Sequence, residues 1–263
     1  MDFTGNEGQI VRVMTLNIRF GLAKDGNNCW ERRKSVFPEL LKQYRADFLA
    51  LQEVNDFQAD FISHILPRHQ IIGIRTPAPA FWQNNVIFFD DKWKCRFRDH
   101  FFLSPTPDIP SRLPKSNWPR QCTMGLFEKE GRRLICINTH LDFSPEVQAH
   151  SAHLIMKRLS GLPEDIPAIL MGDFNAEPHY SCFKIFTGEK KALHVKTGYF
   201  NSVFKKPYPG TFHGFTGETD GDHIDWILFR GRLETMQSEV ISDSFSGIYP
   251  SDHFPVYAVF CQK

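Results

Sequence analysis

Polar side chains follow the buried strands of this sequence at the point where each strand should end. The apolar run at residues 166–171 leads directly into Gly172-Asp173-Phe174-Asn175, and Ser251-Asp252-His253-Phe254-Pro255 stands near the C-terminus. Because alternate side chains of a strand share a face, Asp173 and Asn175 should reach the same side of a sheet edge. A carboxylate and an amide so placed can hold a water molecule or a phosphate. His253 adds an imidazole that can be cationic near neutral pH.

Three further apolar runs end in polar residues. Taken singly, an Asp before Asn after a strand is common in turns, and Asp-His before Pro is common in loops. Turn chemistry explains poorly why so many strand ends are polar, the others being Thr15-Leu16-Asn17, Gln52-Glu53 and Asn138-Thr139-His140. The pattern therefore favours a functional site over a set of unrelated turns.

An ordered series of motifs, from about residue 11 to residue 260, resembles the endonuclease/exonuclease/phosphatase superfamily. The motifs are Leu16-Asn17, Gln52-Glu53, Thr139-His140-Leu141, Gly172-Asp173-Phe174-Asn175, Ile224-Asp225-Trp226-Ile227 and Ser251-Asp252-His253-Phe254-Pro255. This superfamily includes pancreatic-type deoxyribonuclease, abasic-site endonucleases, neutral sphingomyelinases, inositol polyphosphate 5-phosphatases and poly(A) deadenylases with nocturnin. Segments 17–20, 120–123, 210–215 and 249–253 look most like a compact, mainly bacterial branch, with similarity to deadenylase and nocturnin-type members.

Hydrophobic periodicity predicts alternating strands and helices in the first half of the chain and mostly strands later. Strands are expected at 11–18, 48–54, 70–74, 86–89, 133–141, 168–174, 223–229 and 256–261, and helices at 30–44, 57–66, 147–159 and 181–187. These patterns alone indicate an α/β or α+β chain with mixed sheets. The resemblance implies a four-layer α/β/β/α sandwich of two mostly antiparallel sheets, with the site at one end.

Length and composition fit a single domain over residues 1–263. The chain is 41% hydrophobic, which is ample for one large core. The Pro-rich stretch at 104–119 is too short for a domain boundary and is interpreted as a structured surface loop. The cysteines show no Cys-x-x-Cys spacing, so buried free thiols are expected. Residues 1–9 lack an apolar signal core and no run reaches membrane-spanning length, so we expect a cytoplasmic protein without membrane insertion and without an evident obligate protein partner.

Charge argues against a protein that grips long duplex nucleic acid. The formal net charge is +1, and the pI is near 7.7. Short basic clusters, such as Arg32-Arg33-Lys34, lie beside acids and are interpreted as solvated faces. A small or single-stranded substrate whose charge is met by a metal fits this balance better.

The resemblance implies a metal-dependent hydrolase. Glu53 matches the metal-binding glutamate of the family, with Asn17 beside it and Asp252 available for the same or a second ion. Mg²⁺ prefers oxygen ligands of this kind and is often held by one or two carboxylates, and Mn²⁺ is an alternative. Asp173 matches the residue that orients or deprotonates the attacking water, and Asn175 its phosphate-orienting neighbour.

The resemblance also assigns the residues that stabilise charge on the phosphate. His253 faces a non-bridging phosphate oxygen, and Asp225 bonds it and keeps it protonated. His140 stands where some relatives carry tyrosine, and either side chain can donate a hydrogen bond. Arg19 replaces an aspartate of the abasic-site endonucleases, which favours either a substrate-phosphate contact or, equally, a salt bridge to a site carboxylate such as Glu53.

Substrate-binding residues are expected around this centre. Arg120 at the end of the Pro-rich loop is placed to meet a terminal phosphate, while Asn85 and Phe212 stand near motif-bearing strands, where an aromatic ring can stack a base. Core or rim packing explains Phe212 equally well. The favoured function is Mg²⁺-dependent hydrolysis of a phosphodiester or phosphomonoester, on RNA 3′ ends or nucleotides. The alternatives are an inositol or lipid phosphatase, a sphingomyelinase-like phosphodiesterase, and a non-catalytic binding module.

Overall fold

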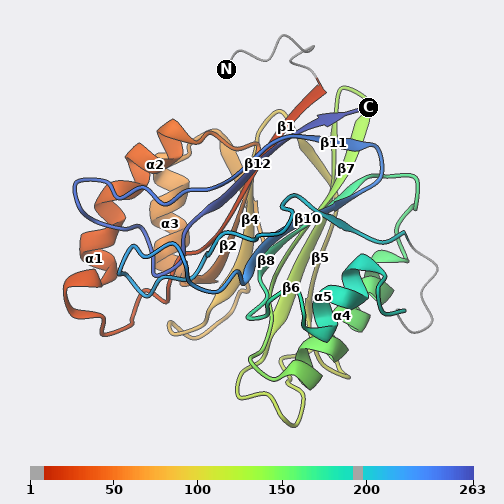
Figure 1. Cartoon of the computed structure of the whole chain (residues 1–263), viewed down its shortest axis with the longest axis horizontal. Helices are drawn as coiled ribbons and strands as arrows, with labels where there is room; N and C mark the ends of the chain where they lie inside the picture. The colour runs from red at the N-terminus through yellow and green to blue at the C-terminus, as the bar shows by residue number, and fades with distance from the viewer. Residues whose placement is uncertain (1–8, 192–197) are drawn as a thin grey trace.

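Two six-stranded sheets pack against each other in the computed structural model, which describes residues 9–191 and 198–263 (Figure 1). The first sheet has the order β11-β12-β1-β2-β4-β3 and the second the order β5-β6-β7-β8-β10-β9. The strands of the first sheet are β1 (Ile10–Asn17), β2 (Phe48–Val54), β3 (His69–Ile72), β4 (Asn84–Asp90), β11 (Leu233–Val240) and β12 (Val256–Gln262). Those of the second are β5 (Lys94–Phe102), β6 (Gln121–Lys129), β7 (Arg132–His140), β8 (Ala168–Asp173), β9 (Asn201–Ser202) and β10 (Asp225–Arg230).

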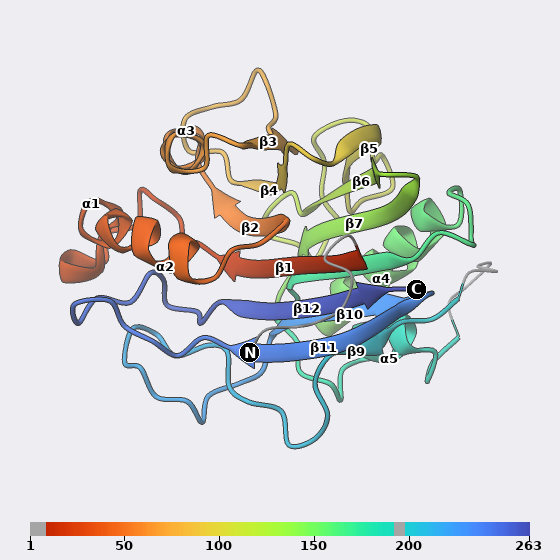
Figure 2. The same ribbon diagram turned by 90° about the horizontal axis from the view of Figure 1, so that it is seen from above.

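Helices cover the outer faces of both sheets, as the view from above shows (Figure 2). Beside the first sheet lie α1 (Trp30–Arg33), α2 (Phe37–Gln43) and α3 (Asp56–Ile65), and beside the second lie α4 (Pro145–Leu159) and α5 (Ser181–Thr187). Short 3₁₀ turns occupy Gly26–Asn28 and Lys34–Val36. The four-layer arrangement of two mostly antiparallel sheets predicted from the sequence is confirmed.

Three layers of apolar side chains hold the elements together. Met14 and Leu16 of β1 face the helices of the first sheet, whereas Val11 and Val13 of the same strand face the second sheet. Because neighbouring side chains of a strand point to opposite faces, a strand buried on both sides must be apolar almost throughout. The third layer joins the second sheet to α4 and α5.

Each sheet contains one parallel pair of strands, and these pairs create the site edge. β1 runs parallel to β2 and β7 runs parallel to β8, while the other neighbours are antiparallel. Parallel strands end at the same edge, so Asn17 stands beside Gln52 and His140 beside Asp173. Antiparallel β10 begins at this edge, with Asp225 opposite Asp173.

The predicted helix at 30–44 is divided in two by a 3₁₀ turn. Pro38 lies in the first turn of α2 and has no backbone N–H to continue a helix from the preceding residues. β5, β6, β9 and β11 were not predicted from the sequence. β5 and β11 carry many polar, exposed side chains, so their hydrophobic pattern is weak.

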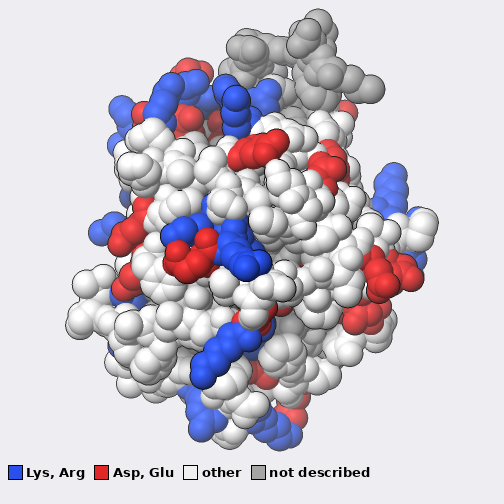
Figure 3. All heavy atoms as spheres, turned by 90° about the vertical axis from the view of Figure 1, so that its left-hand side faces the viewer, with Lys and Arg blue, Asp and Glu red and all other residues white. Residues whose placement is uncertain are grey.

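The surface agrees with the modest net charge. On the face that carries α1 to α3, positive and negative side chains are interspersed among uncharged ones (Figure 3). All six cysteines are free, and Cys122, Cys136 and Cys182 are buried. Within the described ranges, no helix is long and apolar enough to cross a membrane.

Candidate active site

Glu53 projects from an irregularity in the first sheet. The pairing of β2 with β4 shifts register between Leu51 and Val54, and Glu53 adopts a left-handed backbone conformation, with φ of 63°. Such a conformation is costly for a residue with a Cβ and persists where surrounding contacts enforce it. Asn138 of β7 supplies such contacts, because its Nδ2 donates to the carbonyl oxygens of Leu51, at 2.8 Å, and Val86, at 2.7 Å.

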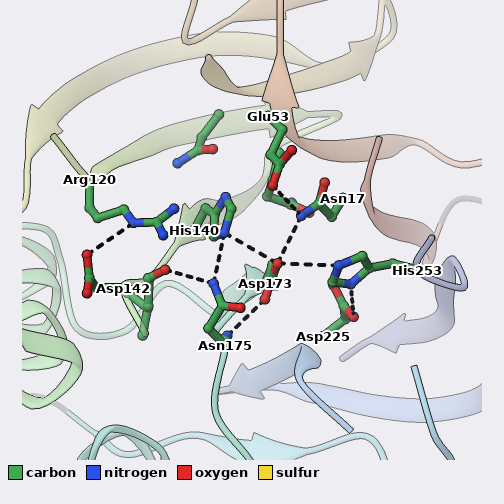
Figure 4. Close-up of polar contacts among 12 residues, drawn as sticks. Asn17, Glu53, Arg120, His140, Asp142, Asp173, Asn175, Asp225 and His253 are labelled. Atoms are coloured by element: carbon green, nitrogen blue, oxygen red, sulfur yellow. Dashed lines mark hydrogen bonds and ion pairs between the residues drawn. The ribbon is translucent and has the colours of Figure 1, made fainter. Parts of the chain in front are cut away.

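Asn17 links the carboxylates of the two sheets. Its Nδ2 donates to Glu53 Oε1 at 3.1 Å and to Asp173 Oδ2 at 2.9 Å (Figure 4). Its Oδ1 accepts from the backbone N–H of Arg19 at 2.9 Å, so the amide nitrogen faces the centre. The backbone N–H of Phe20 donates to Glu53 Oε2 at 2.8 Å. Asn17 therefore fixes the separation of two carboxylates that would otherwise repel each other.

Asp173 is delivered by a close approach of β8 to β7. Gly172 has a φ of +143°, and a Cβ there would lie 1.9 Å from the carbonyl oxygen of Thr139, so only glycine fits. Asp173 Oδ1 then accepts from the backbone N–H of Asn175 at 2.8 Å. Asn175 Nδ2 lies 2.9 Å from His140 Nε2 and donates to the carbonyl oxygen of Leu141 at 3.0 Å.

His253 and Asp225 form a buried ion pair. His253 Nδ1 lies 2.8 Å from Asp225 Oδ2, and His253 Nε2 lies 3.9 Å from Asp173 Oδ2. Thr211 anchors both sides of the pair, because its Oγ1 accepts from the backbone N–H of Asp225 at 3.0 Å and its carbonyl accepts from that of Phe254 at 2.7 Å. The ring of Phe212 meets the His253 ring edge-on, with centroids 5.0 Å apart.

The charges of this cluster divide the titratable groups into distinct roles. Burial lowers the pKa of His253, but the carboxylates of Asp225 and Asp173 outweigh burial and raise it to about 10. Burial, together with the charge of Asp225, raises the pKa of Asp173 to about 7. Burial and the positive charges of Arg120 and His253 hold the pKa of His140 well below its ordinary range. Near neutral pH, His253 is an imidazolium, His140 is neutral, and Asp173 is poised to exchange a proton.

Arg19 and Arg120 flank the centre, and each faces a carboxylate. Arg19 makes two 2.9 Å hydrogen bonds to Asp25, and its Nη1 lies 3.5 Å from Asp252. The salt bridge weighed for Arg19 thus exists, but with Asp25 and Asp252. Arg120 Nε lies 3.5 Å from Asp142.

Asn85 lies near Arg120, because its Nδ2 donates to the carbonyl oxygen of Gln121, the next residue in the chain, at 2.8 Å. Glu53, Arg19, Asn85, Arg120 and His140 all line one cavity of about 490 Å³.

The donor set suits a divalent cation. Asp173, Asp225 and His253 bring ligand atoms within 4.8 Å of one another, but a protonated imidazole has no lone pair for a metal. Glu53 retains a free lone pair on each carboxylate oxygen and borders the cavity. Burial first, and the charge of Asp225 second, raise the pKa of Asp173. A hard cation beside Glu53 would favour the charged form of this carboxylate.

The structure brings the predicted catalytic and metal-binding residues to one edge of the fold, with Arg19, Arg120, Asn85 and Phe212 around them. Two supporting residues were not foreseen. Asn138 was noted only as a polar strand end, and Arg33 was interpreted as part of a solvated face. That interpretation of Arg33 is wrong, because its side chain is buried and its Nη1 donates to the carbonyls of Ile18, at 2.9 Å, and Pro250, at 2.6 Å.

The endonuclease/exonuclease/phosphatase family profile matches residues 14–253, which contain every residue of the centre. The chain belongs to this family. Members of the endonuclease/exonuclease/phosphatase family are hydrolases of phosphate esters and are generally dependent on divalent metals.

Solved structures of the family share the fold over nearly the whole chain. A Bacteroides vulgatus member has a TM-score of 0.86 at 24% identity and covers 97% of this chain and 99% of its own. A Bacteroides thetaiotaomicron mannosyl-6-phosphatase has a TM-score of 0.84 at 25% identity, covering 95% and 99%. The catalytic domain of human nocturnin has a TM-score of 0.71 at 22% identity, covering 96% and 94%.

A curated sequence of the family is also similar. The probable RNA exonuclease NGL3 of Saccharomyces cerevisiae is 26% identical over 169 residues, which are 57% of this chain and 32% of that protein. The match therefore spans about a third of the length of this relative.

Proposed function

We propose that this chain is a Mg²⁺-dependent phosphoesterase that hydrolyses RNA 3′ ends or nucleotides by in-line attack of water. One observation carries the proposal. A continuous set of contacts leads from Glu53 through Asn17 to Asp173, and Asp173 faces the His253–Asp225 ion pair. A hard-ligand carboxylate, a base and a cationic acid thus lie within reach of one phosphate-sized group.

Asp173 is the base in this proposal. Its Oδ1 accepts a hydrogen bond from Asn175 and its Oδ2 one from Asn17, so the orientation of the carboxylate is fixed. A pKa of about 7 lets the carboxylate take the proton of water as the water oxygen attacks phosphorus and the bond to the leaving oxygen breaks. His253, held cationic by Asp225, donates to a non-bridging oxygen as negative charge develops. His140 is neutral, and its one N–H is on Nδ1, because its Nε2 faces the Asn175 amide nitrogen at 2.9 Å.

Glu53 would hold the Mg²⁺ ion, with Mn²⁺ as a substitute, and Asn17 and Asp252 remain candidates for further contacts. Such an ion supplies Lewis acidity and positive charge beside a phosphate. Both carboxylate oxygens of Asp252 already have partners. Its Oδ1 accepts from Ser251 Oγ at 3.0 Å, and its Oδ2 faces Arg19. Glu53 is therefore the primary ligand in the proposal.

RNA ends or nucleotides are favoured because relatives with similar sequence or fold include NGL3 and nocturnin. The similarity to a mannosyl-6-phosphatase makes a sugar phosphate the second candidate. An inositol or lipid phosphatase and a sphingomyelinase-like enzyme rank lower, and a binding module without activity has no need for so complete a set of polar contacts. The free cysteines agree with a reducing compartment, and we propose the cytoplasm as the location.

Glu53→Gln tests the proposal, with Glu130→Gln as the matched control. Glu130 is also a glutamate with positive φ, but it lies in the turn between β6 and β7. We expect Glu53→Gln to lose Mg²⁺-dependent hydrolysis of a short oligoadenylate and of mononucleotides while remaining folded. The substitution removes the negative charge of the metal ligand without leaving a cavity in the fold. Glu130→Gln should behave as wild type. Wild-type turnover by Glu53→Gln at low Mg²⁺, or full activity in excess chelator, would refute the proposal.

A further inference from the structure

A cavity of about 490 Å³ opens beside the catalytic centre. Glu53, His140 and Arg120 form the wall nearest the reacting groups. Aromatic rings contributed by separate loops also line the cavity and stand largely uncovered: Phe81 is 64% exposed, Trp118 59% and Phe143 67%. Large aromatic faces left in water around a single cavity indicate a ligand that covers them.

The same cavity has a polar floor. Gln121 is 4% exposed, and its Nε2 donates to the carbonyl oxygen of Gln83. Gln121 also contacts the side chain of His100, and Arg120 Nε lies 3.5 Å from Asp142 Oδ2. Both side chains are thus held in place by their neighbours in the wall of the cavity.

The charges of the cavity exclude a ligand with many phosphates. Arg19 and Arg120 are the cationic lysine or arginine side chains of its described lining. Arg19 is already engaged by Asp25 and Asp252. Arg120 also faces a carboxylate, that of Asp142 at 3.5 Å. An inositol polyphosphate would bring several charges to two arginines that already face carboxylates, and the desolvation of its phosphates would not be compensated.

The apolar rim offers stacking faces to a ligand. A nucleobase presents two flat faces without hydroxyl groups, and such faces stack on aromatic side chains. The Trp82 ring, which also lines the cavity, is stiffened by the Arg75 guanidinium 4.4 Å from its centroid.

We infer that the cavity binds the terminal nucleoside of the substrate, next to the phosphate under attack, so that the protein acts at a chain end or on a free nucleotide. This inference rests on the proposed phosphoesterase function and specifies its substrate. The base stacks on the rings of Trp118, Phe81 or Phe143.

Binding in the absence of hydrolysis tests the inference. Isothermal titration calorimetry in excess chelator would compare adenosine monophosphate with ribose 5-phosphate and mannose 6-phosphate, for wild type, Trp118→Ala and the control Phe97→Ala. Phe97 is also an exposed aromatic residue, 42% exposed on β5, but it lies outside the cavity lining. We expect adenosine monophosphate to bind tightest and Trp118→Ala to weaken it roughly tenfold, as loss of one stacking platform does. Trp118→Ala should leave ribose 5-phosphate unchanged, and Phe97→Ala should change neither. Equal binding of the three ligands, tighter binding of mannose 6-phosphate, or an equal loss with both adenosine monophosphate and ribose 5-phosphate in Trp118→Ala would overturn the inference.

Hydrolysis of linear and circular oligoadenylates of the same length, with Mg²⁺, separates this inference from the proposed function. We expect the linear substrate to be consumed and the circular one, which has no terminal nucleoside, to be spared. If both are cleaved at the same rate, the inference fails while the phosphoesterase function stands. If neither these nor any mononucleotide or sugar phosphate is hydrolysed, the proposed function itself fails.

Discussion

Asn138→Ala removes a brace between the two sheets and should weaken both the fold and the metal site. Asn138 donates to the carbonyls of Leu51 and Val86 and accepts from Gln52 Nε2 at 2.7 Å. Three buried hydrogen bonds at about 1 kcal/mol each give an expected loss of about 3 kcal/mol in the free energy of unfolding. Urea unfolding measures this loss, and the exposed Asn201→Ala should stay within about 0.5 kcal/mol of wild type.

The position of Asn138 gives a second, independent result. It fixes the residue at which the β2 ladder breaks, directly before Gln52 and Glu53. If this contact sets the projection of Glu53, Mn²⁺ affinity measured by calorimetry should fall roughly tenfold, as for other residues that orient a metal ligand. Unchanged stability would refute the energetic reasoning. A loss of stability with unchanged Mn²⁺ affinity would show that Asn138 packs the sheets without orienting Glu53.

Two further predictions concern histidines. Asp225→Asn should lower kcat/KM, because it reduces the tendency of His253 to be protonated. Since the two residues act together, the double variant should have a kcat/KM little lower than that of His253→Ala alone at saturating Mg²⁺. Additive losses in this double-mutant cycle would show that Asp225 acts independently. Burial and the charge of His253 lower the pKa of His213 from 6.5 to about 4. As pH falls, the unfolded chain binds a proton at His213 before the folded chain does, so the contribution of His213 to stability is lost as pH falls from 6.5 towards 4. The stability advantage of wild type over His213→Phe, from urea unfolding, should therefore shrink by about 2 kcal/mol between pH 7.5 and pH 5, and a gap that is the same at both pH values would contradict this account.

The sequence was most informative where function depends on a residue directly after a buried strand. Asn17, Glu53, His140 and Asp173 follow apolar runs, so strand direction alone placed them at an edge, and the family resemblance placed the two sheets. The bounds of β2 and α5 agree with the predicted ranges.

Residues whose partners are distant in sequence could not be assigned this way. Arg33 bonds a carbonyl 217 positions away, and Asn138 one 87 positions away. Nothing in the neighbourhood of Arg33 distinguishes a buried guanidinium from an exposed one, because the carbonyls that bind it belong to any residue type. The sequence predicted Arg19, Asn85 and Arg120 as substrate-binding residues, but not that they line one cavity, because its lining comes from several separate loops.

The place of β12 between β11 and β1 has a consequence for synthesis on the ribosome. Residues Ile10 to Thr15 of β1 pair with Val256 to Cys261 of β12, so one side of β1 stays without a partner until nearly all of the described chain has been made. His253 emerges just before that last strand, which means that a nascent chain cannot hydrolyse its substrate early. During this interval the open edge of β1 is a template for non-native strand pairing, and chaperone binding would be most needed there.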